Sequence, residues 1–247
     1  MENTHKQMVV NAASNYGVSS EIHEEDFIFK FLIEHPGFNA DEHRVMYYFN
    51  DGAKSAEKLY GLMEKYGSWS NPSVLEFASG YGCVSRHLTM NEKIDLYSSD
   101  IHPQAIDFLT QMGVKAIQSA AVPENFAPRR EFDVVFALSF FSHMPIATWA
   151  RWLVRLTQTV RPGGLIVFTT QGLLSAKYVG CETVPEMGFW FKRESEQGDL
   201  SVDEYGQTVV TEEFVTKNVR TIANVELLEV QLGGWWGHQD VYVLRKT

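Results

Sequence analysis

Apolar positions in the first third of the chain follow a helical pattern. Between Glu24 and Tyr66, apolar side chains recur at spacings of three residues and one residue, with charged side chains between them. This spacing is typical of amphipathic helices. Gly52 and Gly67 are predicted to end helices within this part. We therefore expect residues 1–71 to form an N-terminal helical cap.

After a soft boundary near Asn71-Pro72, the pattern changes to short apolar runs that alternate with helical or turn-forming segments. Such alternation predicts a parallel sheet covered by helices. We expect this second domain to span residues 72–247. Its predicted central strands are Ser73–Phe77, Ile94–Ser99, Lys115–Gln118, Phe132–Leu138 and Leu165–Thr170.

The rhythm breaks at residues 171–211, where glycine, serine and aromatic residues predict an insert. Within it, the aromatic stretch GFWFKRESE, residues 188–196, is expected either to form a strand or hairpin built on the sheet or to shape an acceptor pocket. A closing helix is predicted from Thr211, followed by strands at Val225–Val230 and Gln239–Leu244. The short stretch QLGGWWGH between these strands suits a hairpin.

Composition narrows the class of protein. The 247 residues are 45% hydrophobic, enough for one sizeable core, and 21 basic against 31 acidic residues give a formal charge of -10. This charge weighs against a broad attraction to nucleic acid or to an anionic membrane. The apolar runs are shorter than the ~20 residues of a membrane span, and the first residues lack a signal-peptide layout. We expect a soluble cytoplasmic protein with neither nucleic acid nor membrane as partner and, without a His/Cys/acid cluster at ligand spacing, no metal.

Candidate chemistry lies in the segment VLEFASGYGCVSRHL, residues 74–88. A strand leads into a Gly80-x-Gly82 turn and then a helix, and parallel sheets bind ligands at the carboxyl ends of their strands. As a dinucleotide fingerprint the turn is incomplete, because Ser85 replaces the third glycine. Glu76 precedes the turn, and Asp100 ends the next strand, where a carboxylate can accept both hydroxyls of a ribose. Two acids beside one turn suit a cationic nucleoside better than a diphosphate.

Four segments in this order resemble the class I S-adenosylmethionine-dependent methyltransferases. VLEFASGYG is similar to the first motif of the family, and DIHPQAIDFL to its second-strand acid and following helix. FDVVFALSFFSHMP resembles the fourth strand with its exit loop, and VRPGGLIVFTT the turn into the fifth strand. The resemblance implies an α/β fold: a Rossmann-like, seven-stranded mixed sheet with helices on both faces and the last strand antiparallel.

The resemblance also implies S-adenosylmethionine as the cofactor, bound at several strand ends. Ala78 stands where the family usually has its first glycine, so the backbone there must accept a β-carbon. Ser119 stands roughly where many members carry an acid that contacts adenine. The implied cofactor contacts are Glu76, Ala78, Ser79, Gly80, Tyr81, Gly82, Asp100, Ile101, Ser119, Ala120, Leu138 and Ser139.

Methyl transfer from a sulfonium is an in-line displacement in which the protein mainly supplies alignment. A hydroxyl or ammonium acceptor must also lose a proton, and histidine is the usual base. His143, in the loop after the fourth strand, and His238, in the hairpin, are the candidates. His143 is otherwise a loop histidine that bonds the next helix start, and His238 an ordinary hairpin residue. If the penultimate strand is parallel to the others, Trp235, Trp236 and His238 face the acceptor side.

The predicted function is methyl transfer to oxygen or nitrogen of a small or medium-sized acceptor. The sequence LSFF after the fourth strand differs from the Asn/Asp-Pro-Pro-aromatic tetrad of enzymes that methylate DNA amines. One alternative is an NAD(P)-dependent reductase, which depends on Gly80, Gly82 and Asp100. Another is a catalytically silent methyltransferase-like subunit that binds a partner through Trp235, Trp236 and the aromatic residues of 188–191.

Overall fold

The computed structural model describes residues 3–38, 40–195 and 197–247. The chain divides into two compact units, Met1–Ser119 and Ala120–Thr247. We describe each unit by itself, as the first unit and the second unit. The proposed boundary between a cap of residues 1–71 and a domain of residues 72–247 stays a prediction.

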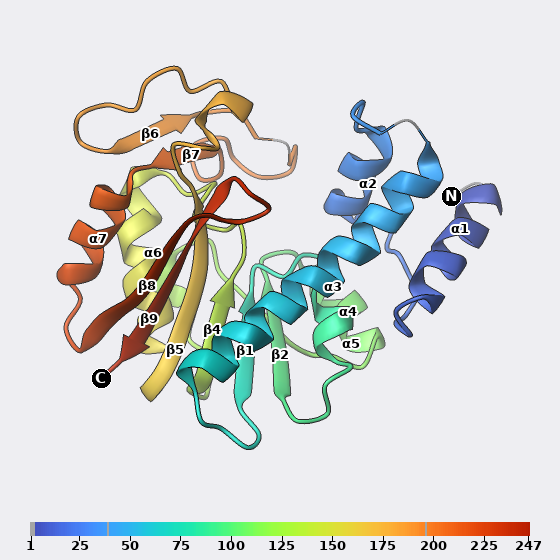
Figure 1. Cartoon of the computed structure of the whole chain (residues 1–247), viewed down its shortest axis with the longest axis horizontal. Helices are drawn as coiled ribbons and strands as arrows, with labels where there is room; N and C mark the ends of the chain where they lie inside the picture. The colour runs from blue at the N-terminus through green and yellow to red at the C-terminus, as the bar shows by residue number, and fades with distance from the viewer. Residues whose placement is uncertain (1–2, 39, 196) are drawn as a thin grey trace. The chain divides into compact units, whose positions relative to one another are not determined.

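Three helices form the N-terminal part of the first unit: α1 (Asn3–Ser14), α2 (Phe27–Glu34) and α3 (Asp41–Tyr66). Figure 1 shows α1 and α2 beside the long α3, and their apolar faces form a shared core. The expected helical stretch between residues 24 and 66 is thus helical but split in two. Pro36 explains the break, because proline disfavours the helical conformation of the residue before it, and His35 is extended.

The two glycines predicted to end helices both lie in closely packed positions, but only one of them ends a helix. Gly52 lies inside α3, so its prediction as a helix end is wrong. A β-carbon on Gly52 would lie 2.2 Å from the carbonyl oxygen of Cys83, which shows that the α3 backbone touches the turn before α4 (Ser85–Leu88). Gly67 does follow the last residue of α3, as predicted. Its φ of -119° is a backbone conformation that any residue can adopt. There, a β-carbon would overlap the Trp69 ring.

We expect Gly52→Ala to destabilise the protein by about 1–3 kcal/mol, because overpacking against Cys83 outweighs the better helix propensity of alanine. Gly61→Ala is the matched control, since a β-carbon on this exposed glycine of α3 meets no atom within 4 Å. The control should stabilise by ~0.5–1 kcal/mol. Urea unfolding of both variants measures the difference, and equal free energies would contradict the packing argument.

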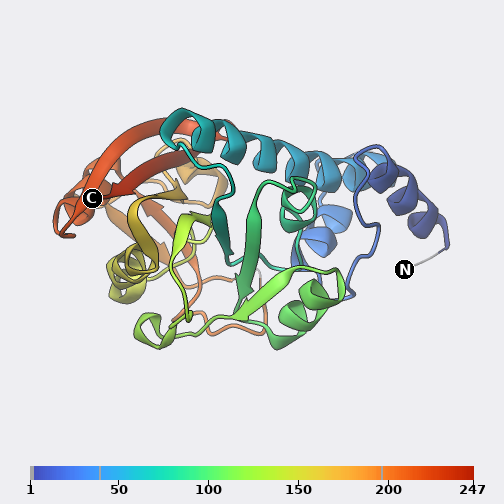
Figure 2. The same cartoon turned by 90° about the horizontal axis from the view of Figure 1, so that it is seen from below.

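The sheet part of the first unit contains three parallel strands, β1 (Ser73–Phe77), β2 (Asp95–Asp100) and β3 (Lys115–Gln118). The bounds of β1 and β3 are as predicted, and β2 lies one residue later. Helix α5 (Pro103–Gln111) follows β2. Figure 2 shows α3 on one side of β1 and β2 and α5 on the other. The carboxyl ends of these strands therefore meet at one edge between two helical layers.

The second unit begins with the short helix η1 (Pro123–Asn125) and contains four long strands with two α-helices. Strands β4 (Phe132–Ala137) and β5 (Val160–Gln171) are parallel, β9 (Gln239–Lys246) is antiparallel to β5, and β8 (Val225–Trp235) is antiparallel to β9. Strand β8 therefore runs in the direction of β4 and β5, as predicted. The turn between β8 and β9 lies at the carboxyl edge of β4 and β5. The helices are α6 (Ile146–Gln158) and α7 (Glu212–Arg220).

The insert at residues 171–211, of which residue 196 lies outside the described residues, forms structure of its own. It contains the short helix η2 (Ala176–Tyr178) and strands β6 (Phe189–Lys192) and β7 (Gln207–Val210). Strands β6 and β7 pair with each other in a separate two-stranded sheet. Thr211 then caps α7 by accepting a hydrogen bond from the Phe214 amide at 3.2 Å, which confirms the predicted closing helix.

The long strands have the order β3-β2-β1-β4-β5-β9-β8. This order confirms the expected seven-stranded mixed sheet with an antiparallel last strand. Within residues 3–38, 40–195 and 197–247, every helix is too short or too polar to cross a membrane.

Candidate functional site

The glycine-rich turn after β1 depends on left-handed backbone. Ala78, Gly80 and Gly82 have φ values of 57°, 55° and 79°. A β-carbon on Gly82 would lie 2.8 Å from the Met112 side chain of the α5 end, whereas one on Gly80 would meet no atom within 4 Å. Gly82 therefore allows close packing, and Gly80 leaves its backbone open to a ligand. Ala78 adopts the strained conformation that the missing glycine implies, at a cost of roughly 1–2 kcal/mol.

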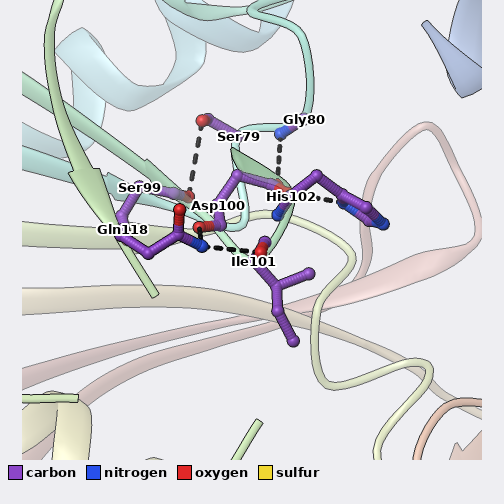
Figure 3. Close-up of polar contacts among 7 residues, drawn as sticks. All are labelled: Ser79, Gly80, Ser99, Asp100, Ile101, His102 and Gln118. Carbon is purple, nitrogen blue, oxygen red and sulfur yellow. Dashed lines mark hydrogen bonds and ion pairs between the residues drawn. The ribbon is translucent and has the colours of Figure 1, made fainter. Parts of the chain in front are cut away.

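Asp100, at the end of β2, is bonded to this turn. Its Oδ2 accepts a hydrogen bond from the Gly80 amide at 2.8 Å, and its Oδ1 accepts one from the His102 amide at 3.0 Å (Figure 3). The Nδ1 atom of His102 lies 2.8 Å from the same Oδ1. Each carboxylate oxygen has more than one acceptor site, so Asp100 retains acceptor capacity for a ligand hydroxyl.

His102 is a residue of this site that the sequence reasoning missed. It follows Asp100 by two positions and precedes Pro103, the first residue of α5. The sequence did contain a signal for His102: a histidine two positions after the carboxylate that ends a strand, directly before a helix. The side chain is partly exposed, so a ligand at Asp100 would meet His102 as well.

Backbone bonds bring the other predicted contacts of the first unit to the same edge. The Ser79 amide donates to the Ser99 carbonyl at 3.0 Å, and the Ser119 amide donates to the Asp100 carbonyl at 2.8 Å. Gln118 pairs with Asp100 in the sheet, and its Nε2 donates to the Ile101 carbonyl at 2.6 Å (Figure 3). Ser79, Ile101 and Ser119 thus lie at the end of β2 near Asp100, and their role as cofactor contacts stays a prediction. All three are partly exposed.

Glu76 lies beneath the turn and is 3% exposed. Its Oε2 accepts hydrogen bonds from the hydroxyls of Ser85 at 2.5 Å and Ser98 at 3.3 Å. Burial raises the pKa of Glu76 to about 7, although both hydroxyls favour the ionised form, and the nearby Asp100 charge raises it further. Its carboxyl group therefore joins β1 to α4 and β2.

We expect Glu76 to make the protein less stable as pH rises. Its pKa is 4.5 as a free group and about 7 in the fold, so the unfolded chain releases this proton first. Between these values stability should fall by about 1–3 kcal/mol. Urea unfolding at about pH 5 and about pH 8 should show that the wild type loses this stability relative to Glu76→Gln as pH rises.

The comparison with Glu76→Gln is needed because buried histidines act in the opposite direction. Burial lowers the pKa values of His87 and His143 to about 4, so both destabilise the fold as pH falls below 6.5. These effects are common to the wild type and the variant and cancel in the difference. An equal pH slope in the two proteins would show that Glu76 is ionised throughout.

Tyr81 is a predicted contact whose aromatic side chain is buried. Its ring stacks on His23 with centroids 4.6 Å apart and an angle of 14° between the planes. Ala105 and Phe108 of α5 complete this cluster. The ring therefore joins the turn to the N-terminal part of the first unit.

In the second unit, a polar network links three strand ends. Ser139, directly after β4 and Leu138, has a φ of 56°, and its amide donates to Thr169 Oγ1 at 2.8 Å. Thr169 donates to Gln239 Oε1 at 2.7 Å, and Gln239 Nε2 donates to Ser139 Oγ at 2.9 Å. Leu138, Ser139 and Ala120 are partly exposed. The network fixes the carboxyl edge of this unit.

His143 is held by the insert. Its ring stacks on Tyr205 with centroids 4.4 Å apart, and its Nδ1 lies 2.8 Å from the Gly206 carbonyl oxygen. Since a carbonyl only accepts, Nδ1 carries the proton and Nε2 has the lone pair. Burial lowers the pKa of His143 to about 4, against the opposing effect of the Gly206 carbonyl, so the ring is neutral near pH 7.

His238 lies in the β8–β9 turn and bonds to Ser175, near the start of the insert. Ser175 Oγ donates to the His238 carbonyl at 2.7 Å and lies 3.1 Å from its Nδ1. Burial lowers the pKa of His238. The neighbouring tryptophans differ: Trp236 is 38% exposed, but Trp235 is 2% exposed and packs on Phe136. The expectation that Trp235 faces an acceptor is therefore wrong, because its ring belongs to the core.

In the described ranges, no group of three or more His, Cys, Asp or Glu residues is arranged to hold a metal ion. The candidate residues thus form two separate groups: a carboxylate beside an open turn within the first unit, and a polar strand edge with a neutral histidine within the second unit.

Residues 75–166 match the family model described as a methyltransferase domain. Among solved structures, an S-adenosylmethionine-dependent methyltransferase from Clostridium acetobutylicum is similar, with a TM-score of 0.60 and 12% identity over 79% of this chain and 92% of that chain. The glycopeptide N-methyltransferase MtfA, in complex with S-adenosyl-L-methionine, has a TM-score of 0.58 and 11% identity over 80% and 88%.

A third similar structure is the Burkholderia thailandensis 1,6-didemethyltoxoflavin-N1-methyltransferase with bound 1,6-didemethyltoxoflavin and S-adenosylhomocysteine. Its TM-score is 0.53, with 13% identity over 81% of this chain and 78% of that chain. Curated protein sequences give no significant match. Residues 75–166 therefore match a methyltransferase domain, and the chain has the fold of the S-adenosylmethionine-dependent methyltransferases to which it is similar.

Proposed function

We propose that the protein transfers the methyl group of S-adenosylmethionine to an oxygen or nitrogen atom of a small or medium-sized acceptor. The observation that carries this proposal is the pairing of the open Gly80 backbone with the Asp100 carboxylate. MtfA was solved with S-adenosyl-L-methionine, and the Burkholderia enzyme with a small heterocyclic compound and S-adenosylhomocysteine, which supports the same classes of ligand here.

The residues of the first unit fit the nucleoside part of this cofactor. Asp100 supplies the remaining acceptor site of its Oδ2 for a ribose hydroxyl, and Gly80 lets the ligand approach the main chain. Ile101 and Ser119 lie beside Asp100 along the strand edge, and Ser79 anchors the turn. When bound, the cofactor supplies a methyl group that is already activated by its sulfonium charge. The protein then has to align the acceptor and exclude water.

The acceptor side belongs to the second unit in this proposal. Neutral His143 presents the lone pair of Nε2, which can accept a hydrogen bond or a proton from an acceptor hydroxyl or amine. Tyr205 and Gly206 of the insert hold its ring, so we assign the insert at residues 171–211 to the acceptor side. The low pKa of His143 makes it a weak base, suited to an acceptor whose proton becomes acidic as the methyl group moves.

The rival of a catalytically silent binding subunit loses part of its support. It needed Trp235 and the aromatic residues of 188–191 as exposed contacts, but Trp235 and Phe189 are buried. The reductase alternative has no comparable support in the methyltransferase-domain match. The cytoplasmic location stays a prediction.

We expect calorimetry to detect S-adenosylhomocysteine binding and no NADPH binding. Asp100→Ala should weaken the former by about 1.5–3 kcal/mol, because it removes a charged acceptor of the ribose hydroxyls. Asp95→Ala, at the opposite end of β2, is the matched control and should bind with wild-type affinity. Tight binding of NADPH without any binding of S-adenosylhomocysteine would contradict the proposed cofactor.

The acceptor is sought by incubating the protein with radiolabelled S-adenosylmethionine and fractionated host metabolites. With the acceptor known, His143→Ala should lower kcat by about 10²–10⁴ and leave S-adenosylhomocysteine affinity nearly unchanged, because the base acts on the acceptor. His238→Ala is the comparison, and its loss should be smaller because we assign the base to His143. Full activity of both variants would show that alignment alone suffices.

A further inference from the structure

The segment between α1 and α2, residues 15–26, lies against the glycine-rich turn within the first unit. We call it the connecting segment. The His23 ring of this segment stacks on Tyr81 at 4.6 Å and meets Phe108 edge-on at 5.3 Å. Tyr81 lies between Gly80 and Gly82, so the connecting segment contacts the part of the turn that the cofactor would approach.

Arg86 of α4 connects this segment to the turn. Its side chain is buried, with the residue 3% exposed. Its Nε donates to the Gly82 carbonyl at 3.0 Å, and its Nη1 donates to the carbonyls of Ser19 at 2.8 Å and Glu21 at 3.0 Å. The planar guanidinium is suited to this task, because one rigid group donates in several directions at once. A single side chain thus holds both the turn and the connecting segment.

The far end of the connecting segment belongs to the same network. Arg86 Nη2 donates to the Tyr48 hydroxyl at 3.2 Å, and this hydroxyl donates to Asp26 Oδ2 at 2.6 Å. Asp26 also caps α2 through the Phe29 amide. Tyr48 and Asp26 are both buried, so loss of Arg86 would leave the Asp26 carboxylate without its nearby compensating charge.

We propose that Arg86 is a positioning residue that couples the order of the connecting segment to cofactor binding at the glycine-rich turn. The inference rests on the proposed function only for the identity of the ligand. A ligand that selects the ordered turn stabilises whatever shares Arg86 with that turn, and the ordered segment in return favours the binding-competent turn. The Gly82 carbonyl is the shared point, since it belongs to the turn and accepts from Arg86.

The test compares Arg86→Gln with the wild type by hydrogen exchange and calorimetry, using S-adenosylhomocysteine as the probe. In the wild type, the probe should slow amide exchange in residues 15–26 by about tenfold. In Arg86→Gln, the segment should exchange fast with or without the probe, and the dissociation constant should rise about tenfold.

Arg44→Gln is the matched control, because Arg44 also holds backbone carbonyls of an N-terminal loop, those of His35 and Phe38. This variant should speed amide exchange in residues 35–38 but leave the affinity and the amide exchange of residues 15–26 unchanged. A merely structural role of Arg86 would make the two arginine variants behave alike. Arg86→Lys retains the buried charge without the fork, so it should fold and show an intermediate affinity.

The outcomes separate the two proposals. A wild type that does not bind S-adenosylhomocysteine overturns the proposed cofactor. If the wild type binds it, and Arg86→Gln shows fast amide exchange in residues 15–26 with unchanged affinity, the coupling is overturned. Weakened binding with a segment that stays ordered also overturns it. If Arg86→Gln does not fold, the same two readouts on Arg86→Lys decide, and wild-type values for both count against the proposal.

Discussion

The hydrogen bond between the Gly80 amide and Asp100 is the contact on which the candidate site depends. It joins the turn after β1 to the end of β2, two places that adjacent parallel strands bring to one edge. The left-handed backbone at Ala78, Gly80 and Gly82 lets the amide point at the carboxylate. Glu76 supports the same turn from beneath through two serine hydroxyls. The site is thus a junction of two strand ends and one helix start.

The second unit solves a similar problem with neutral groups. Ser139, Thr169 and Gln239 exchange hydrogen bonds across three strand ends, so neutral groups link these ends. His143 is also neutral, because burial opposes its protonation. Glu76 and Asp100 therefore lie in the first unit, where a cationic ligand is proposed, and these neutral groups lie in the second unit, to which the acceptor is assigned in the proposal.

Much of the fold was accessible from the sequence, because strand-length apolar runs and a glycine-rich turn leave direct traces in the residue pattern. The bounds of β1 and β3 are of this kind, whereas the antiparallel last strand was implied by the resemblance to the methyltransferases. The role of Gly52 was not accessible, since it depends on a carbonyl of Cys83 that is distant in sequence. For the same reason the sequence did not show Arg86 as a link among Ser19, Tyr48 and Gly82, nor Trp235 as a core residue. His102 was missed although its position beside Asp100 could be seen.

The bond between His143 and the Gly206 carbonyl makes the tautomer of His143 independent of the side chains of the insert. The acceptor of the Nδ1 proton is a main-chain atom, which every amino acid at position 206 would provide. A β-carbon there would overlap Phe191 and the Lys192 carbonyl, so glycine is needed for space and not for the bond itself. Other side chains of the insert can change while the imidazole keeps the same tautomer. Under the proposed function, the choice of acceptor can therefore change without a change in the protonation of His143.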